Sequence, residues 1–186
     1  MQERENILRI FQEAKTAFEK GDSAKLKSLS NQTNNTAALT QDPDNIAVAV
    51  IVYTLSKIIE REDYKKLPGW DKFYQIHKDS INKKIDALKR GDDKAFRNEL
   101  IRIRKAMESL SGRLKTYIQD VLRKASINKA SKLYEHGISM EKTASLLGIT
   151  LFELASYAGQ KEDINVQQTR TIDVKARIKM AEDFFR

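Results

Sequence analysis

Hydrophobic side chains recur every three or four positions along much of the chain, a spacing typical of amphipathic α-helices. Residues 3–20 and residues 70–90 each carry one such apolar stripe. Both stripes end at a Gly-Asp pair, and Gly21 and Gly91 occupy the position where helices often terminate with a positive φ. We therefore predict a helix over each segment, joined to the next element by a short turn.

The stretch after the first predicted helix is less regular. Asp22 or Ser23 can cap a second helix, with Leu26 and Leu29 facing inward. Residues 30–36, which read Ser-Asn-Gln-Thr-Asn-Asn-Thr, are polar and poor in helix-forming side chains. This composition predicts a loop or a frayed helix end.

A third helix is predicted from the pair Asp42-Pro43, because Asp caps helices and Pro is favoured in the first turn. It extends to about Arg61. Residues 46–53 are apolar on nearly every side of this helix, which is typical of the most buried helix in a bundle. Their β-branched content leaves a strand as the alternative.

Apolar residues from Phe96 to Ala125 alternate steps of three and four, which predicts one long helix over residues 93–125. Gly112 lies off this stripe, and its cost of about 1 kcal/mol relative to Ala is not expected to end the helix. Basic side chains fall opposite the apolar stripe, on a face that we call the basic ridge. The ridge consists of Lys94, Arg97, Arg102, Arg104, Lys105, Arg113 and Arg123.

The chain has 186 residues and a net charge of +8, which favours nucleic acid as a partner. Residues 91–137 hold eleven Lys/Arg and six Asp/Glu, so +5 of the net charge lies on the basic ridge and its extension. One interpretation of the ridge is a solvated face of an amphipathic helix. The other is a surface that contacts phosphate or an acidic partner.

The most specific pattern lies between residues 127 and 159. A helix to about residue 136 is followed by Ser139, a possible cap, and by a short helix that ends at Gly148. Ala144 is small enough for two helices to cross closely, and Ile149 and Leu154 can fill the angle between them. This layout predicts a helix-turn-helix, and the alternative is a chance pair of helices with a glycine turn.

Two stretches, residues 129–144 and 147–154, resemble the helix-turn-helix of small archaeal and bacterial proteins proposed as antitoxins. Residues 156–159 and 177–185 look like uncharacterised archaeal relatives. The resemblance covers residues 127–186 only. It implies a regulator that binds DNA or a protein partner, with a nuclease toxin as a possible neighbour.

A DNA-reading helix-turn-helix presents the first residues of its second helix to base edges. Here these positions are Thr150, Leu151, Phe152, Glu153 and Ser156, and no Arg, Lys, Asn or Gln occurs before Gln160 and Lys161. Glu153 would face a phosphate-rich surface. Phosphate affinity is therefore expected from the basic ridge. The predicted nucleic-acid-binding residues are Arg97, Arg102, Arg104, Lys105, Arg113, Lys142, Thr150, Ser156, Gln160 and Lys161.

Large apolar groups also occur where a partner protein could bind. Leu151 and Phe152 would be exposed on an isolated helix-turn-helix, and such patches mark contact surfaces. After a polar linker, residues 169–175 predict a short strand or an extended arm, followed by a terminal helix. Phe184 and Phe185 at its end are expected to dock, and a dimer clasp is one role for this arm.

Enzymatic chemistry has little support in the sequence. There is no cysteine, no glycine-rich phosphate loop and no nucleophile elbow, and nothing places carboxylates on a shared face for a metal. His77 is expected to pack within a helix, and His136 to complement a helix end. Without a membrane-spanning stretch or a signal-peptide pattern, we expect a cytoplasmic protein with no cofactor, no metal and no membrane partner.

Together these patterns predict an all-α protein. Residues 1–125 form a helical bundle of five helices, the last of them long. Residues 126–160 form the helix-turn-helix unit, and residues 161–186 the C-terminal arm and helix. The expected function is a homodimeric, non-enzymatic DNA-binding regulator, and the alternative is a protein–protein adaptor or antitoxin-like module whose helix-turn-helix packs on protein.

Overall fold

The computed structural model of the chain describes residues 1–40, 42–108, 110, 112–135, 138–147 and 149–162. This part of the chain is helical with no strand, so the all-α prediction is confirmed. The helices are α1 (Arg4–Lys20), α2 (Ser23–Thr40), α3 (Pro43–Ile59), α4 (Glu62–Lys65), α5 (Trp70–Lys89), α6 (Asp93–Glu108), α7 (Gly112–Glu135), α8 (Met140–Leu147) and α9 (Leu151–Glu162).

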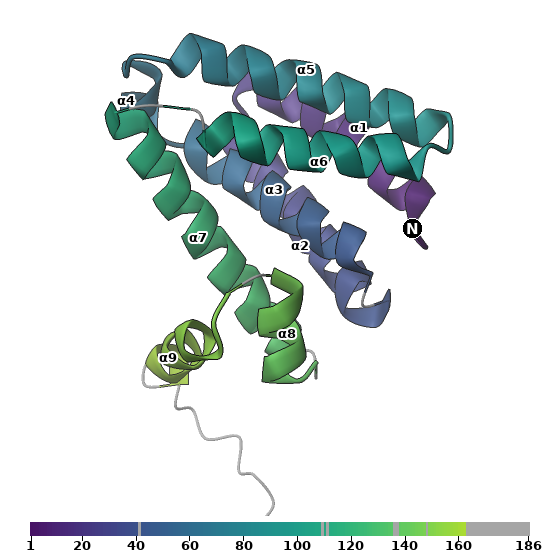
Figure 1. Cartoon of the computed structure of the whole chain (residues 1–186), viewed down its shortest axis with the longest axis vertical. Coiled ribbons are helices and arrows are strands. Elements are labelled where there is room, and N and C mark those ends of the chain that lie inside the picture. Colours follow the sequence, from purple (N-terminus) through teal and green to yellow (C-terminus); the bar gives the residue numbers. More distant parts are fainter. Residues whose placement is uncertain (41, 109, 111, 136–137, 148, 163–186) are drawn as a thin grey trace, which may run out of the picture.

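Helices α1 to α7 enclose one large hydrophobic core. Helix α5 packs against both α1 and α6, and α3 packs against both α2 and α7, while α8 and α9 lie at the far end of α7 (Figure 1). Phe11 of α1 meets Phe96 of α6 edge to face, with ring centroids 5.8 Å apart. The stripe spacing therefore identified core-facing positions on helices that are distant in sequence.

Residues 46–53 form the middle of α3, and most of their side chains are buried. Asp42 caps this helix by accepting a hydrogen bond from the backbone N–H of Asp44 at 2.9 Å, and Pro43 occupies the first turn. The strand alternative for this segment is therefore wrong. Burial of α3 between α2 and α7 outweighs the weak strand preference of its valines and isoleucines.

The polar residues 30–36 are also helical, which corrects the prediction of a loop or frayed end. They lie within α2, and Ser30, Thr33 and Asn34 are buried. The Ser30 hydroxyl donates to the Ala49 carbonyl at 2.6 Å, and the Thr33 hydroxyl donates to the Leu29 carbonyl at 2.9 Å. Tertiary packing thus overrides a low helix propensity, and the hydroxyls of Ser30 and Thr33 have hydrogen-bond partners inside the bundle.

The predicted single helix over residues 93–125 is wrong in its continuity, because α6 ends at Glu108 and α7 begins at Gly112. Gly112 has a φ of 61°, a conformation that an α-helix interior does not contain. Leu110 between the two helices is buried in the same core as Phe96 and Leu114. The apolar spacing persisted across the break because both helices cover one core. The long helix that leads into α8 is α7.

The predicted boundary between residues 125 and 126 falls inside α7. Beyond it, α8 packs against α3, and Leu147 joins a small apolar cluster that α2, α3 and α7 also build. That cluster is centred on Ala37, Ile46, Leu133 and Ile138. No helix in the described part of the chain is long and apolar enough to cross a membrane.

Candidate functional site

The helix-turn-helix begins with a capped α8. The backbone N–H of Lys142 donates to the Ser139 hydroxyl at 3.2 Å, so Ser139 caps the helix as predicted. At the other end, the N–H of Ile149 donates to the Ala144 carbonyl at 3.1 Å and closes the turn. Helix α9 starts two residues later, and the Thr150 carbonyl accepts its first-turn bond from Leu154.

A compact core holds α8 and α9 against α7. Ala130, Ala144 and Leu154 are buried together, with Met140 and Ile149 packed around them. The small Ala144 side chain permits the close approach of the helices, and Leu154 anchors α9 to the unit. The positions that the sequence assigned to this core are therefore in contact.

A polar contact also fixes α9 on α7. The Asn128 side-chain amide donates to the Tyr157 hydroxyl at 3.1 Å. Tyr157 lies three residues after the buried Leu154, so both face α7 from one side of α9. The opposite side of the helix is left toward solvent.

The outward side of α9 is apolar at its first turn. Phe152 is 80% exposed and Leu151 is 45% exposed, and both are among the large apolar side chains that the bundle does not cover. Thr150 and Ser156 are exposed beside them. Of the predicted contact residues, these four and the exposed Lys142 of α8 are gathered in the helix-turn-helix unit.

The basic ridge lies elsewhere in the fold. Its residues from Lys94 to Lys105 are on α6, which packs with α5, while α8 and α9 pack at the other end of α7 (Figure 1). Arg113 stands at the first turn of α7, far along the helix from the turn. The ridge and the first turn of α9 are thus separate surfaces.

Two arginines of the ridge are held by carboxylates. Arg97 makes a bidentate ion pair with Asp44 of α3, in which the Nε–Oδ1 distance is 3.0 Å and the Nη2–Oδ2 distance is 2.7 Å. Hydrogen bonding to Asp44 raises the pKa of Arg97. Arg102 pairs with Glu99 at 3.0 Å. These contacts give Arg97 a structural role in joining α6 to α3.

The remaining predicted residues divide into two groups. Arg113 donates to the Tyr117 hydroxyl at 3.0 Å, and Lys105 is exposed on α6. The side chains of Arg104, Gln160 and Lys161, together with Phe184 and Phe185, lie outside the part of the chain that the structure describes.

Three of the buried ionisable side chains in the described helices, His77, Lys84 and Lys129, have strongly lowered pKa values, and the two lysines had not been singled out. His77 donates from Nδ1 to the Phe73 carbonyl at 2.8 Å, and burial lowers its pKa to about 3. Burial likewise lowers the pKa of Lys84 and of Lys129 to about 7. Lys84 follows Ser80 by four positions on the inward stripe of α5, a spacing that marks it as inward-facing.

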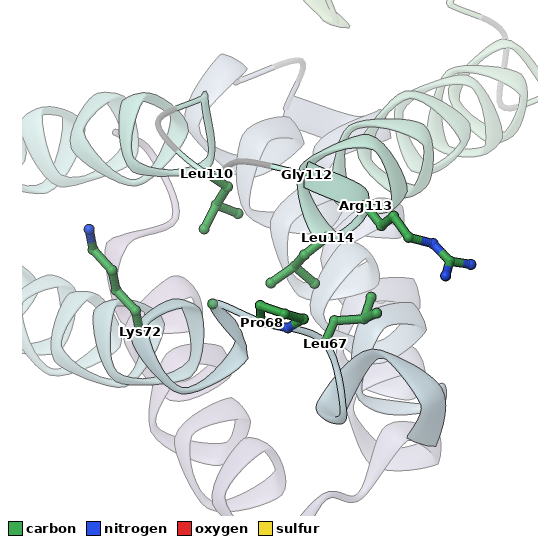
Figure 2. A pocket seen from close by; sticks show the side chains of 8 residues that line it. Leu67, Pro68, Lys72, Leu110, Gly112, Arg113 and Leu114 are labelled. Carbon is green, nitrogen blue, oxygen red and sulfur yellow. The ribbon is translucent and has the colours of Figure 1, made fainter.

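A cavity of about 320 Å³ lies where α5 and α7 begin. Leu110, Leu114 and Pro68 form its apolar wall, and Lys72 and Arg113 extend at its two sides (Figure 2). The described residues that line it include no carboxylate, histidine or hydroxyl group, so they supply no acid–base pair. Elsewhere among the described residues, no three metal-binding side chains of the His, Asp or Glu type cluster.

No protein-family model matches this chain, and no match was found among curated proteins or solved structures.

Proposed function

We propose that the chain is a DNA-binding regulatory protein that acts through α7, α8 and α9 without catalysis of its own. The observation that carries the proposal is the closed unit around Ala130, Ala144 and Leu154, which leaves the first turn of α9 uncovered. In DNA-binding helix-turn-helix proteins this turn enters the major groove. A net charge of +8 favours association with duplex DNA.

The chemistry of α9 indicates which base features it would contact. Leu151 and Phe152 suit the methyl group of thymine, since apolar side chains make that contact in the major groove. The hydroxyls of Thr150 and Ser156 can bond to either donor or acceptor edges. This turn contains no Arg or Lys that could make a bidentate contact with guanine. We therefore expect modest sequence specificity and a preference for sites rich in A·T pairs.

We expect the N-terminus of α8 to bind a phosphate of the DNA backbone. Its free N–H groups and positive end of the helix dipole favour an anion, and the exposed Lys142 lies in its first turn. Because most of the basic ridge lies on α6, away from α8 and α9, phosphate affinity is assigned here to Lys142 and the α8 terminus. This replaces the ridge as the expected source of phosphate contacts.

Removal of Lys142 tests this assignment. We expect Lys142→Ala to weaken binding to sheared genomic duplex DNA several-fold at all sequences and to lower the salt slope by about one. Lys105→Ala, an equally exposed lysine on α6, is the matched control and should leave affinity within twofold. A mobility-shift assay over a salt series measures both. An equal loss of DNA affinity in the two variants would show that Lys142 acts only through the net charge of the protein and not through a contact with phosphate.

Self-association is the second candidate, and the exposure of Phe152 favours it. A phenylalanine that is 80% exposed could gain about 2 kcal/mol by burial against a second copy of the chain. The double variant Leu151→Asp/Phe152→Asp separates the two functions. If α9 joins two copies, sedimentation will show a dimer that this variant disperses, while Ile101→Asp on α6 leaves it intact. If α9 reads DNA, the sedimentation profile is unchanged and duplex binding is lost.

A further inference from the structure

Lys129 of α7 is buried in the interface with α2 and α3. Its side chain is 0% exposed, and its ammonium donates to the Asn31 side-chain oxygen of α2 at 3.1 Å. The same ammonium lies 4.5 Å from the centre of the Tyr53 ring of α3. A cation in this position has a neutral amide and an aromatic face as its partners.

A second lysine donates to the same amide, and a third lies near Lys129. Lys132, one turn along α7, donates to the same Asn31 oxygen at 3.3 Å. Lys27 precedes Asn31 by one turn of α2 and is close enough to lower the pKa of Lys129. None of these three lysines forms an ion pair with a described carboxylate.

The charge of this cluster is offset only in part. Glu60 of α3 accepts from Lys57 at 2.6 Å, which is the main reason that its pKa is lowered, and attraction to Lys27 is a smaller cause. Lys57 itself lies 5.9 Å from the centre of the Tyr53 ring. The surroundings of Lys129 therefore carry an excess of positive charge from α2, α3 and α7.

A buried ammonium without a counter-charge is unfavourable, and it is relieved either by loss of the proton or by a bound anion. Desolvation is the largest cause of the lowered pKa of Lys129, about 7, followed by Lys132 and Lys27. The Asn31 oxygen carries only a partial negative charge, yet two ammonium groups converge on it. An anionic oxygen would satisfy the same donors more strongly.

We propose that Lys27, Lys129 and Lys132 bind a tetrahedral oxyanion, a phosphate group or sulfate, beside Asn31 where α2 and α7 meet. A tetrahedral oxyanion presents oxygens in several directions, as donors from two helices require, whereas a single carboxylate presents two oxygens in one plane. Reorientation of the long Lys129 stem brings its ammonium from the amide to the anion. This site is independent of the first turn of α9.

Calorimetric titration of the full-length chain with sodium sulfate, against sodium chloride of equal ionic strength, tests the site. We expect one saturable site per chain in the wild-type protein and at least tenfold weaker binding in Lys132→Ala. Lys132 is only partly buried, so this variant is expected to fold. Lys115→Ala, a partly exposed lysine on the same helix, is the matched control and should bind like the wild type.

The pH dependence gives a second readout. Sulfate keeps its charge between pH 6 and pH 8, so a change in affinity over that range reports protonation of the protein. Affinity should rise as pH falls through 7, because Lys129 gains a proton there, and Lys129→Met should remove this rise. Inorganic phosphate should displace sulfate. Equal sulfate binding by wild type, Lys132→Ala and Lys129→Met, absence of binding, or failure of phosphate to compete would overturn the proposal.

Discussion

Replacing Leu154 with alanine is expected to release α9 from α7 while the helical bundle stays folded. Leu154 is fully buried in a small core whose other buried members are Ala130 and Ala144, so it is the one large side chain that is fully buried there. A buried Leu→Ala change costs about 3 kcal/mol. That loss falls on the few contacts that hold α9, and we expect DNA binding to disappear with them.

Hydrogen exchange of the intact protein measures this result. In Leu154→Ala, the amides of α9 should exchange at least a hundredfold faster, and those of α1 and α5 should be unchanged. Leu151→Ala changes an exposed leucine of the same helix and should leave α9 protected. Unaltered protection of α9 in Leu154→Ala would mean that this side chain does not hold the unit together.

The second large effect is expected at Lys84. Replacement by methionine should raise the free energy of unfolding by about 2 kcal/mol at pH 7, because it removes a buried charge and keeps a similar volume. Lys84 is 1% exposed, and its ammonium has the Ser80 hydroxyl at 2.8 Å and the Phe11 ring as its contacts. Attraction to Glu99 offsets the burial only in part.

The gain from Lys84→Met should depend on pH in a defined direction. The pKa of Lys84 is about 7 in the folded state and 10.5 without burial, so the unfolded chain binds the extra proton between these values. The penalty of the wild-type lysine is full below pH 7 and fades as pH rises toward 10.5. The advantage of methionine should therefore be largest at and below pH 7 and small by pH 10.

Urea unfolding at a series of pH values measures this difference. Lys83→Met is the matched control, because Lys83 is exposed on the same helix and its change should stay within about 0.5 kcal/mol. A destabilised Lys84→Met protein at pH 7, or a gain that does not vary with pH, would contradict the assignment of an unfavourable buried charge.

Much of the helix-turn-helix could be predicted because its signals are local. A cap at Ser139, a small residue at Ala144 and apolar residues at Ile149 and Leu154 have fixed offsets, and each makes the expected contact. Helix-forming stripes are equally local, which is why the main helices of the bundle were predictable. The exposure of the apolar side chains in the first turn of α9 was predictable as well, because no earlier segment of the sequence carries a pattern that would cover them.

Features that depend on distant partners were not predictable in the same way. The polar residues 30–36 form part of α2 because Ala49 of α3 and Lys129 of α7 supply hydrogen-bond partners, and no local pattern names them. The break before Gly112 escaped notice because the apolar spacing reports burial in a shared core and not continuity of the helix. The ion pair of Arg97 with Asp44, across 53 positions, pairs a cation that stays exposed, and a helical wheel of one segment could not show that partner.

The central claim, that the first turn of α9 contacts DNA, is tested most directly by nuclear magnetic resonance of the 15N-labelled full-length chain titrated with a short mixed-sequence duplex at low salt. We predict that amide shift changes concentrate on residues 139–142 and 150–156 and diminish as salt is added. Shift changes confined to α6, or no saturable change at any residue of α8 and α9, would contradict it.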